Sequence, residues 1–93
     1  MKIKGFDWDH GNWPKCGKHG VSREEIERLF LDGKAFVTPD IKHSTQQESR
    51  HIAAGKVCGR ALFVAFVIRN NHIRPVSARY MHEKEARNYE AST

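Results

Sequence analysis

ALFVAFVI, residues 61–68, decides the fold, because this longest apolar run of the chain has no polar residue on either face. Such a run predicts a central strand that is covered on both sides. The turn-forming residues 69–72 (RNNH) follow, and asparagine tolerates the positive φ that a tight hairpin requires. Residues 73–80 then predict the returning strand, in which Pro75 indicates an edge position or a bulge.

Three further strands are expected on the N-terminal side of this hairpin. Residues 50–57 predict the strand that precedes the central one, with a turn at residues 58–60 between them. Residues 34–38 predict a strand that ends at a proline, and the polar residues 39–48 predict a loop. Near the start of the chain, residues 3–8 indicate a short strand, because apolar and polar side chains alternate.

The clearest local signal is a capping box formed by Ser22 and Glu25. Apolar residues follow it with helical spacing, and Gly33 provides a helix terminator. We therefore predict a helix over residues 23–32. One or two helical turns that start at Asn12 are also expected, because proline is tolerated in the first turn of a helix.

Residues 82–90 predict a short helix near the end of the chain, since acidic side chains in its first turn favour the helix dipole. The expected order is a strand, two helices, an antiparallel meander and a last short helix. Helices that are segregated from an antiparallel sheet indicate an α+β fold with two layers. Because 93 residues are the size of one domain, we expect residues 1–93 to form a single domain.

The positive charge of the chain is concentrated in its second half. Residues 1–49 carry eight Lys or Arg and eight Asp or Glu, whereas residues 50–93 carry eight Lys or Arg and three Asp or Glu. The net charge of +5 therefore falls on the half with the strongest strand signals, which indicates a basic surface for nucleic acid. No apolar segment is long enough to cross a bilayer or to act as a signal sequence, so we expect a cytoplasmic protein without membrane partners.

An ordered set of short motifs extends over nearly the whole chain. It comprises residues 6–9 (FDWD), 18–22 (KHGVS), Phe30, 43–44 (HS), Glu48, Arg50, Gly55, 73–79 (IRPVSAR) and 83–90 (EKEARNYE). This set resembles the BrnT toxins, which are ribonucleases that arrest translation and are the toxin halves of type II toxin–antitoxin pairs. The resemblance implies a RelE-like fold and a partner similar to BrnA, a ribbon-helix-helix antitoxin. It also implies a heterotetramer that assembles through the antitoxin dimer.

RNA can be cleaved without a metal ion, because its own 2′-hydroxyl attacks the adjacent phosphate. The protein must then transfer protons and stabilise the negative charge that develops around phosphorus. Arginine suits the second task, because its planar guanidinium offers two parallel donors and a permanent charge. Arg79 is the first candidate for this role and Arg50 the second, and the resemblance supports both. In a regular strand Arg74 and Arg79 lie on opposite faces, unless a bulge at Pro75 changes their parity.

Other residues are candidates for proton transfer or for RNA binding. Histidine titrates close to neutral pH, and the resemblance implies that lysine and tyrosine can share the task. The candidates for proton transfer are His19, Lys18, His82 and Tyr80. The further candidates for binding RNA are Arg74, Lys56 and Arg87. We expect neither a metal ion nor another cofactor.

Two other functions fit parts of the same sequence. Cys16 and His19 have the spacing of zinc ligands, and Cys58 or His43 would complete the set, but the chain has no second close pair. Alternatively, the basic surface binds an acidic partner or RNA without cleaving it, because the same arginines serve both purposes. A third interpretation is that the arginines are surface charges paired with nearby glutamates.

Overall fold

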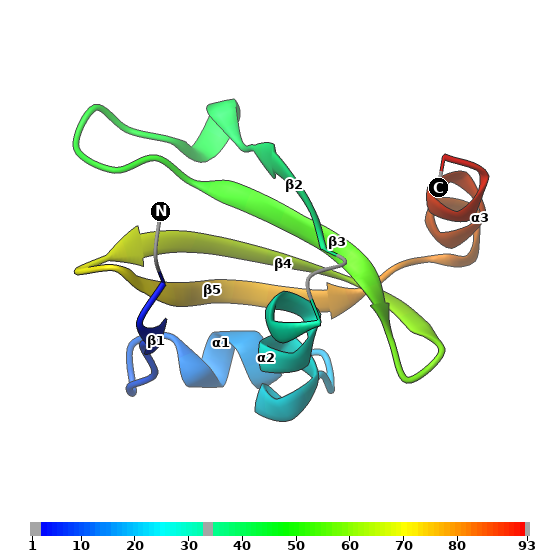
Figure 1. Cartoon of the computed structure of the whole chain (residues 1–93), viewed down its shortest axis with the longest axis horizontal. Coiled ribbons are helices and arrows are strands. Elements are labelled where there is room, and N and C mark those ends of the chain that lie inside the picture. The colour runs from blue at the N-terminus through cyan, green and yellow to red at the C-terminus, as the bar shows by residue number, and fades with distance from the viewer. Residues whose placement is uncertain (1–2, 33–34, 93) are drawn as a thin grey trace.

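A five-stranded sheet forms the body of the computed structural model, which describes residues 3–32 and 35–92 (Figure 1). In chain order the elements are β1 (Gly5–Phe6), α1 (Trp13–Gly17), α2 (Arg23–Leu31), β2 (Phe36–Pro39), the 3-10 helix η1 (Ile41–His43), β3 (His51–Val57), β4 (Arg60–Arg69), β5 (His72–Tyr80) and α3 (Glu83–Ala91). The strands lie in the order β1-β5-β4-β3-β2. All neighbouring pairs are antiparallel except β1 and β5, which are parallel. The predicted α+β fold with two layers is confirmed, and its sheet is mixed because of this one pair.

The first strand is shorter than the sequence predicts. Residues 3–8 were the expected span, whereas β1 contains only Gly5 and Phe6. The chain turns immediately afterwards, because the carbonyl of Asp9 accepts hydrogen bonds from the backbone N–H groups of Asn12 and Trp13. This turn leads directly into α1, so the helical turns expected from Asn12 are confirmed.

Both predicted hairpin turns are present. Cys58 and Gly59 join β3 to β4 with φ values of 52° and 80°. Asn70 and Asn71 join β4 to β5 with φ values of 52° and 62°. Two consecutive residues with positive φ are typical of type I′ turns, whose twist matches the twist of the flanking strands. The three long strands are therefore connected by the shortest turns available to them.

Helix α2 begins with the predicted capping box. The hydroxyl of Ser22 accepts a hydrogen bond from the backbone N–H of Glu25 at 3.1 Å, and the backbone N–H of Ser22 donates to Glu25 Oε1 at 3.0 Å. The helix ends at Leu31, one residue before the predicted end. The predicted terminator Gly33 lies outside the described residues, as does the start of the strand expected at residues 34–38.

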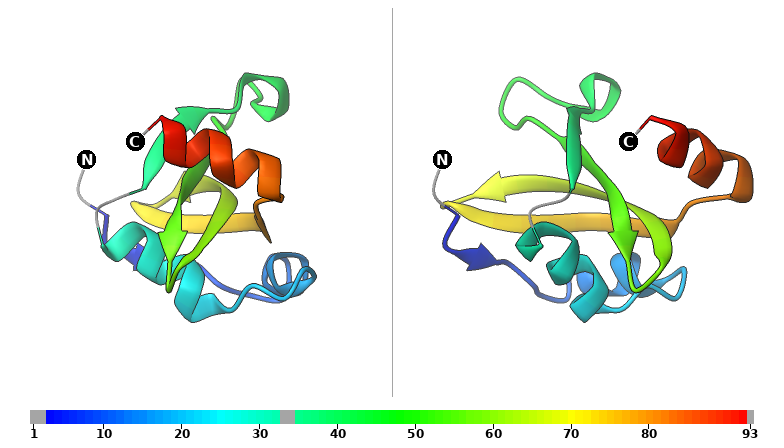
Figure 2. Two further views of the ribbon diagram at one scale, coloured as in Figure 1. Left: turned by 90° about the vertical axis from the view of Figure 1, so that its right-hand side faces the viewer. Right: turned by 45° about the vertical axis from the view of Figure 1, so that its right-hand side comes forward.

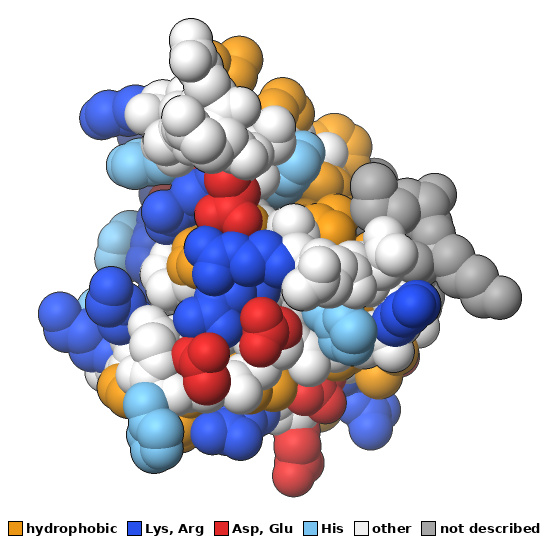
Figure 3. Space-filling model, turned by 90° about the vertical axis from the view of Figure 1, so that its left-hand side faces the viewer, with side chains coloured by type: hydrophobic (Ala, Val, Ile, Leu, Met, Phe, Trp, Pro, Cys, Tyr) orange, Lys and Arg blue, Asp and Glu red, His pale blue; other side chains and the backbone are white. Residues whose placement is uncertain are grey.

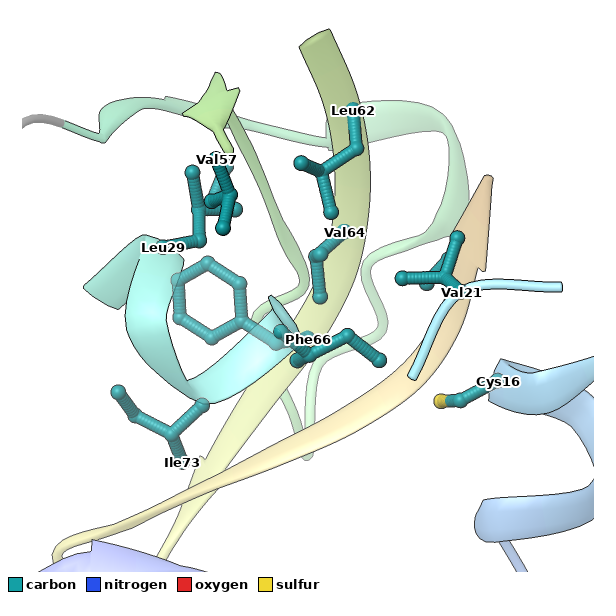
Figure 4. Packing of buried hydrophobic residues seen from close by; sticks show 11 residues of the cluster. Cys16, Val21, Leu29, Val57, Leu62, Val64, Phe66 and Ile73 are labelled. Atoms are coloured by element: carbon teal, nitrogen blue, oxygen red, sulfur yellow. The ribbon is translucent and has the colours of Figure 1, made fainter. Parts of the chain in front are cut away.

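Helices α1 and α2 lie on one side of the sheet, which we call the covered face (Figures 1 and 2). Its β4 side chains are Leu62, Val64 and Phe66, which are at most 4% exposed. They pack against Ile26 and Leu29 of α2 in the core of the protein (Figure 4). The alternate residues of β4 therefore supply most of the buried apolar surface that joins helices to sheet.

The other side of the sheet, the open face, carries the remaining residues of β4. Helices α1 and α2 do not cover this face (Figure 2). Ala65 and Val67 are nevertheless only 8% and 5% exposed, so the prediction that this central strand is covered on both sides is confirmed. They are short side chains in the middle of the sheet, and longer ones such as Arg74, opposite Val67, flank them.

Helix α3 extends beyond the sheet from the end of β5 and has no buried residue (Figures 1 and 2). Ion pairs connect it to the strands, between Arg79 and Glu85 and between Lys56 and Glu90. Its predicted span, residues 82–90, agrees with the observed helix to within one residue. None of the helices in the described part of the chain is long and apolar enough to cross a membrane.

Candidate active site

A bulge in β5 brings the candidate arginines to one face of the sheet. Ala65 pairs with Ser77 and the next residue of β4, Phe66, pairs with Pro75, so Val76 has no partner in the ladder. The extra residue reverses the alternation of side chains between the two halves of β5. Arg74 is therefore opposite Val67, and Arg79 is opposite Phe63, both on the open face. The bulge considered at Pro75 is therefore present, and it places Arg74 and Arg79 on the same face of the sheet.

Asn12 supports this bulge from the edge of the sheet. Its side chain is 1% exposed, and its amide nitrogen donates to the carbonyl of Pro75 at 2.8 Å and to the carbonyl of Asp7 at 2.9 Å. Its amide oxygen accepts from the backbone N–H of Asp9 at 2.8 Å. A buried carbonyl that a bulge excludes from the ladder needs such a partner. Asn12 therefore fixes α1 against the part of β5 that orients Arg74.

The open face contains a first depression of about 610 Å³, which we call the basic hollow. Its charged or titratable lining residues are Lys15, Lys18, His19, Arg50, Arg69 and Arg74. They come from α1, from the residues after it, from the residue before β3 and from both strands of the long hairpin. Figure 3 shows lysine and arginine side chains gathered on this end of the molecule, with carboxylates beside them. Such a hollow suits a phosphate group.

A second depression, of about 330 Å³, adjoins the first, and we call it the apolar hollow. It shares His19, Arg50 and Ser77 with the basic hollow. Its other lining residues are Asp40, His43, Ile52, Phe63, Ala65, Ala78, Arg79 and Glu85. Arg50 thus lies where the two hollows meet, and the first and second candidate arginines, Arg79 and Arg50, line the same cavity.

Carboxylates already occupy most of the guanidinium groups on the open face. Arg79 donates to both oxygens of Glu85 at 2.8 and 2.9 Å, and Arg74 donates to both oxygens of Asp9 at 3.0 Å. These hydrogen bonds lower the pKa of both carboxyls, that of Glu85 to about 2. Arg69 is paired with Glu48 in the same way. The interpretation that the candidate arginines pair with nearby glutamates therefore fits Arg79, whereas Arg74 and Arg50 have aspartates as their neighbours.

Arg50 differs from these paired arginines. Its Nε is buried and has no hydrogen-bond partner among the described residues, and the nearest carboxylate oxygen, of Asp40, is 3.7 Å away. An unsatisfied buried donor on a charged group is costly, unless a ligand or water completes it. Among the described residues, Arg50 is therefore the guanidinium on this face that no carboxylate holds by a hydrogen bond.

The structure separates the proton-transfer candidates into two groups. His19 lines both hollows and Lys18 lines the basic hollow, so each shares a hollow with Arg50. Tyr80 lies on the covered face, opposite Leu62, where its hydroxyl donates to both oxygens of Glu25 at 2.9 Å. His82 precedes α3 and lies outside the described linings of the two hollows.

Two of the RNA-binding candidates also lie away from the hollows. Lys56 forms an ion pair with Glu90 at 2.6 Å, and Arg87 is paired with Glu83 at 3.7 Å on the exposed surface of α3. Arg74, in contrast, lines the basic hollow. A contact between RNA and Lys56 or Arg87 stays a prediction.

A histidine–carboxylate pair in the apolar hollow was not predicted from the sequence. His43 Nδ1 is 2.9 Å from Asp40 Oδ2, and this contact lowers the pKa of Asp40. A carboxylate on one ring nitrogen fixes the orientation of the imidazole. The signal was an aspartate and a histidine three positions apart, which the turn of η1 brings together.

The spacing of Cys16 and His19 does not produce a zinc site in this structure. Cys16 is fully buried in the core, and burial raises the pKa of its thiol to about 11. His19 lies on the open side, in the hollows. Within residues 3–32 and 35–92, no group of three or more metal-ligand side chains is close enough to hold a metal ion.

The comparison with protein families gives one match. A family model described as "Ribonuclease toxin, BrnT, of type II toxin-antitoxin system" matches residues 8–85, which is most of the chain. The matched span contains both hollows, from the residues before α1 to Glu85 of α3. No curated protein and no solved structure matches the chain.

Proposed function

Since the chain belongs to the BrnT family of ribonuclease toxins of type II toxin–antitoxin systems, we propose that it is an endoribonuclease that needs no metal ion. In this proposal, the 2′-hydroxyl of the RNA attacks the adjacent phosphate, and cleavage of messenger RNA in the cytoplasm arrests translation. The observation that carries the proposal is Arg50, whose buried, unsatisfied Nε lies where a basic hollow meets a second hollow that contains two histidines.

The reaction requires one bond to form and one to break at phosphorus. The 2′-oxygen bonds to phosphorus as its proton passes to a general base, and the bond from phosphorus to the 5′-oxygen breaks as a general acid protonates that oxygen. The products are a 2′,3′-cyclic phosphate and a 5′-hydroxyl. Positioned acid–base groups typically contribute 10²–10⁴-fold, and fixed cationic donors often contribute more.

The residues of the two hollows can be assigned to these tasks. Arg50 and Arg79 bind the non-bridging oxygens of the phosphate and stabilise the phosphorane. His19 and His43 line the same hollow as these arginines, and we assign the two proton transfers to this pair. Lys18 adds positive charge to the basic hollow. Tyr80 and His82 have no part in this proposal, because they lie outside the hollows.

Cleavage of a single-stranded RNA in excess chelator tests the reaction. We expect cleavage to persist, the fragments to end in a cyclic phosphate, and a 2′-deoxy substitution before the scissile phosphate to block it. Arg79→Ala should abolish cleavage, whereas Arg28→Ala, on α2, should cleave at the parent rate. Loss of activity in chelator would contradict metal independence, and normal cleavage by Arg79→Ala would contradict the role of Arg79.

Binding without cleavage is the second candidate function. The bidentate carboxylates on Arg69, Arg74 and Arg79 favour it, because they leave few free cationic donors to stabilise the extra charge of a phosphorane. The same assay distinguishes the two. RNA that is retained intact by the wild-type protein over many hours would support a binding domain and exclude the ribonuclease.

A type II system pairs its toxin with a protein antitoxin, and we propose a ribbon-helix-helix protein similar to BrnA. In this proposal the antitoxin covers the basic hollow, and its own dimer joins two toxins into a heterotetramer. The mass of the purified complex tests the stoichiometry. If the contact is largely ionic, the affinity should fall as salt rises, because exposed charge pairs are screened. An affinity that is unaffected by salt would indicate an apolar interface instead.

A further inference from the structure

The floor of the apolar hollow is formed by small and apolar side chains on three adjacent strands. Ile52 of β3, Ala65 of β4 and Ser77 of β5 lie on one rung of the sheet, since Ala65 pairs with both neighbours. On the next rung Phe63 lies opposite Arg79. The short side chains of Ala65 and Ser77 leave the depression, and the ring of Phe63 forms its wall.

This composition differs from that of the basic hollow beside it. Phe63 and Ile52 are only partly buried. They therefore expose apolar surface on a face that carries several charged groups. The guanidinium carbon of Arg79 lies over the Phe63 ring, 4.9 Å from its centre, so the cation stacks on the ring and the two side chains form one wall. A flat ligand that is apolar on its faces and polar at its edge fits beside such a wall.

We propose that the apolar hollow is a nucleobase subsite, in which one base of the RNA stacks on Phe63 while the adjoining phosphate binds Arg50. This inference rests on the proposed function, because it concerns the same substrate. Two observations carry it. The hollow is continuous with the basic hollow through Arg50, His19 and Ser77, and its volume of about 330 Å³ lies in the range of small-molecule sites.

The polar rim of the hollow matches the edge of a base. Asp40 and Glu85 supply carboxylate oxygens that accept hydrogen bonds, and His43 supplies a ring nitrogen. An aromatic wall with such a rim is how proteins hold the unpaired bases of single-stranded RNA. An apolar side chain of the antitoxin is the competing occupant, and the experiment below separates the two.

The test uses the dinucleotide dApdA, which has no 2′-hydroxyl and therefore cannot be cleaved. Two analogues each lack one base but keep the phosphate and both sugars. We expect loss of one particular base to weaken binding about tenfold, as measured by NMR titration, because base–aromatic stacking has an effect of this size. The amide signals of Ile52 and Ala65 should shift with the complete dinucleotide and not with that analogue.

Variants then locate the effect at Phe63. Phe63→Leu should reduce the tenfold preference for the base to about twofold, because the ring is lost while an apolar side chain remains. Phe36→Leu is the matched control, since Phe36 of β2 lies on the same face of the sheet as Phe63. It is 66% exposed and does not line the hollow. The Phe36→Leu variant should keep the preference, and Arg50→Gln should weaken all three ligands equally.

Equal binding of dApdA and both analogues by the wild-type protein would overturn the subsite, whether or not Phe63→Leu folds. The same result together with weakened antitoxin binding by Phe63→Leu would assign the hollow to the antitoxin. The two proposals can fail separately. If the protein cleaves RNA but binds dApdA no better than the analogues that lack a base, only the subsite is contradicted. If binding depends on the base but RNA is not cleaved, only the ribonuclease is contradicted.

Discussion

The two faces of the sheet share the same strands but follow different physical rules. On the covered face Leu62, Val64 and Phe66 pack against α2. Along β4 these side chains alternate regularly with those that point to the open face. On the open face the same β4 presents Phe63, Ala65 and Val67 among arginines and carboxylates. The covered face gains free energy from apolar burial, whereas the open face holds charge at fixed positions. The difference teaches that fold and chemistry are separable in this protein.

The largest expected effect is on the chemistry of the open face. Arg50→Gln should lower the rate of RNA cleavage between about a hundredfold and a thousandfold, as loss of one fixed donor to a developing charge does. The free energy of unfolding should hardly change, because the ion pair of Arg50 with Asp40 is long, at 3.7 Å. Cleavage rates and urea denaturation measure the two quantities.

Arg28→Gln is the matched control for this change, because it removes the same charge from the exposed surface of α2. It should cleave RNA at the parent rate. A loss of activity that is equal in the two variants would show that net charge matters and that position does not.

On the covered face, Leu62→Ala should destabilise the protein by about 3 kcal/mol, because Leu62 is fully buried and its truncation leaves a cavity. Urea denaturation measures this loss. Ile41→Ala, which truncates a side chain that is 81% exposed, should change stability by less than about 0.5 kcal/mol. Similar losses in both variants would contradict the assignment of the core to the covered face alone.

Asn12 is the residue that links the two faces. Asn12→Ala removes the partners of the carbonyls of Asp7 and Pro75, so we expect a loss of about 2 kcal/mol in stability. Because the bulge also orients Arg74, cleavage should fall about tenfold at temperatures where the variant is folded. Asn88→Ala, on the surface of α3, should affect neither quantity. A destabilised variant with the full cleavage rate would show that the bulge does not position the arginines.

The smallest expected effect is a dependence of the stability of helix α3 on pH. The pKa of Glu85 is lowered to about 2 by Arg79, so its carboxylate stabilises the folded state above the unfolded value of 4.5. This contribution should be lost as the pH falls through about 2, and the protection factors of the backbone amides of α3, which correct for the intrinsic dependence of exchange on pH, should then fall. Glu85→Gln should remove this dependence, whereas Glu83→Gln should keep it. Protection factors in wild-type α3 that do not vary over this range would contradict the role of the pair.

Much of the fold follows from local signals. The capping box at Ser22 and Glu25 set the start of α2, and the asparagines after β4 set the second hairpin, because both depend on neighbours in sequence. The site was less predictable. Arg50 and Arg79 were candidates by residue type, but their shared hollow depends on register and on a bulge. Tyr80 was a candidate by the same reasoning and lies on the other face.

The sequence by itself determined which segments become strands and helices, because propensity, capping and turn chemistry act over a few neighbouring residues. It also determined the family, since the ordered motifs extend over most of the chain. The tertiary structure alone decided which charges meet: one unpaired residue, Val76, reverses the alternation of β5, and a distant asparagine holds that bulge in place. The physical reason is that side-chain direction along a strand depends on parity, and parity depends on pairing with another strand.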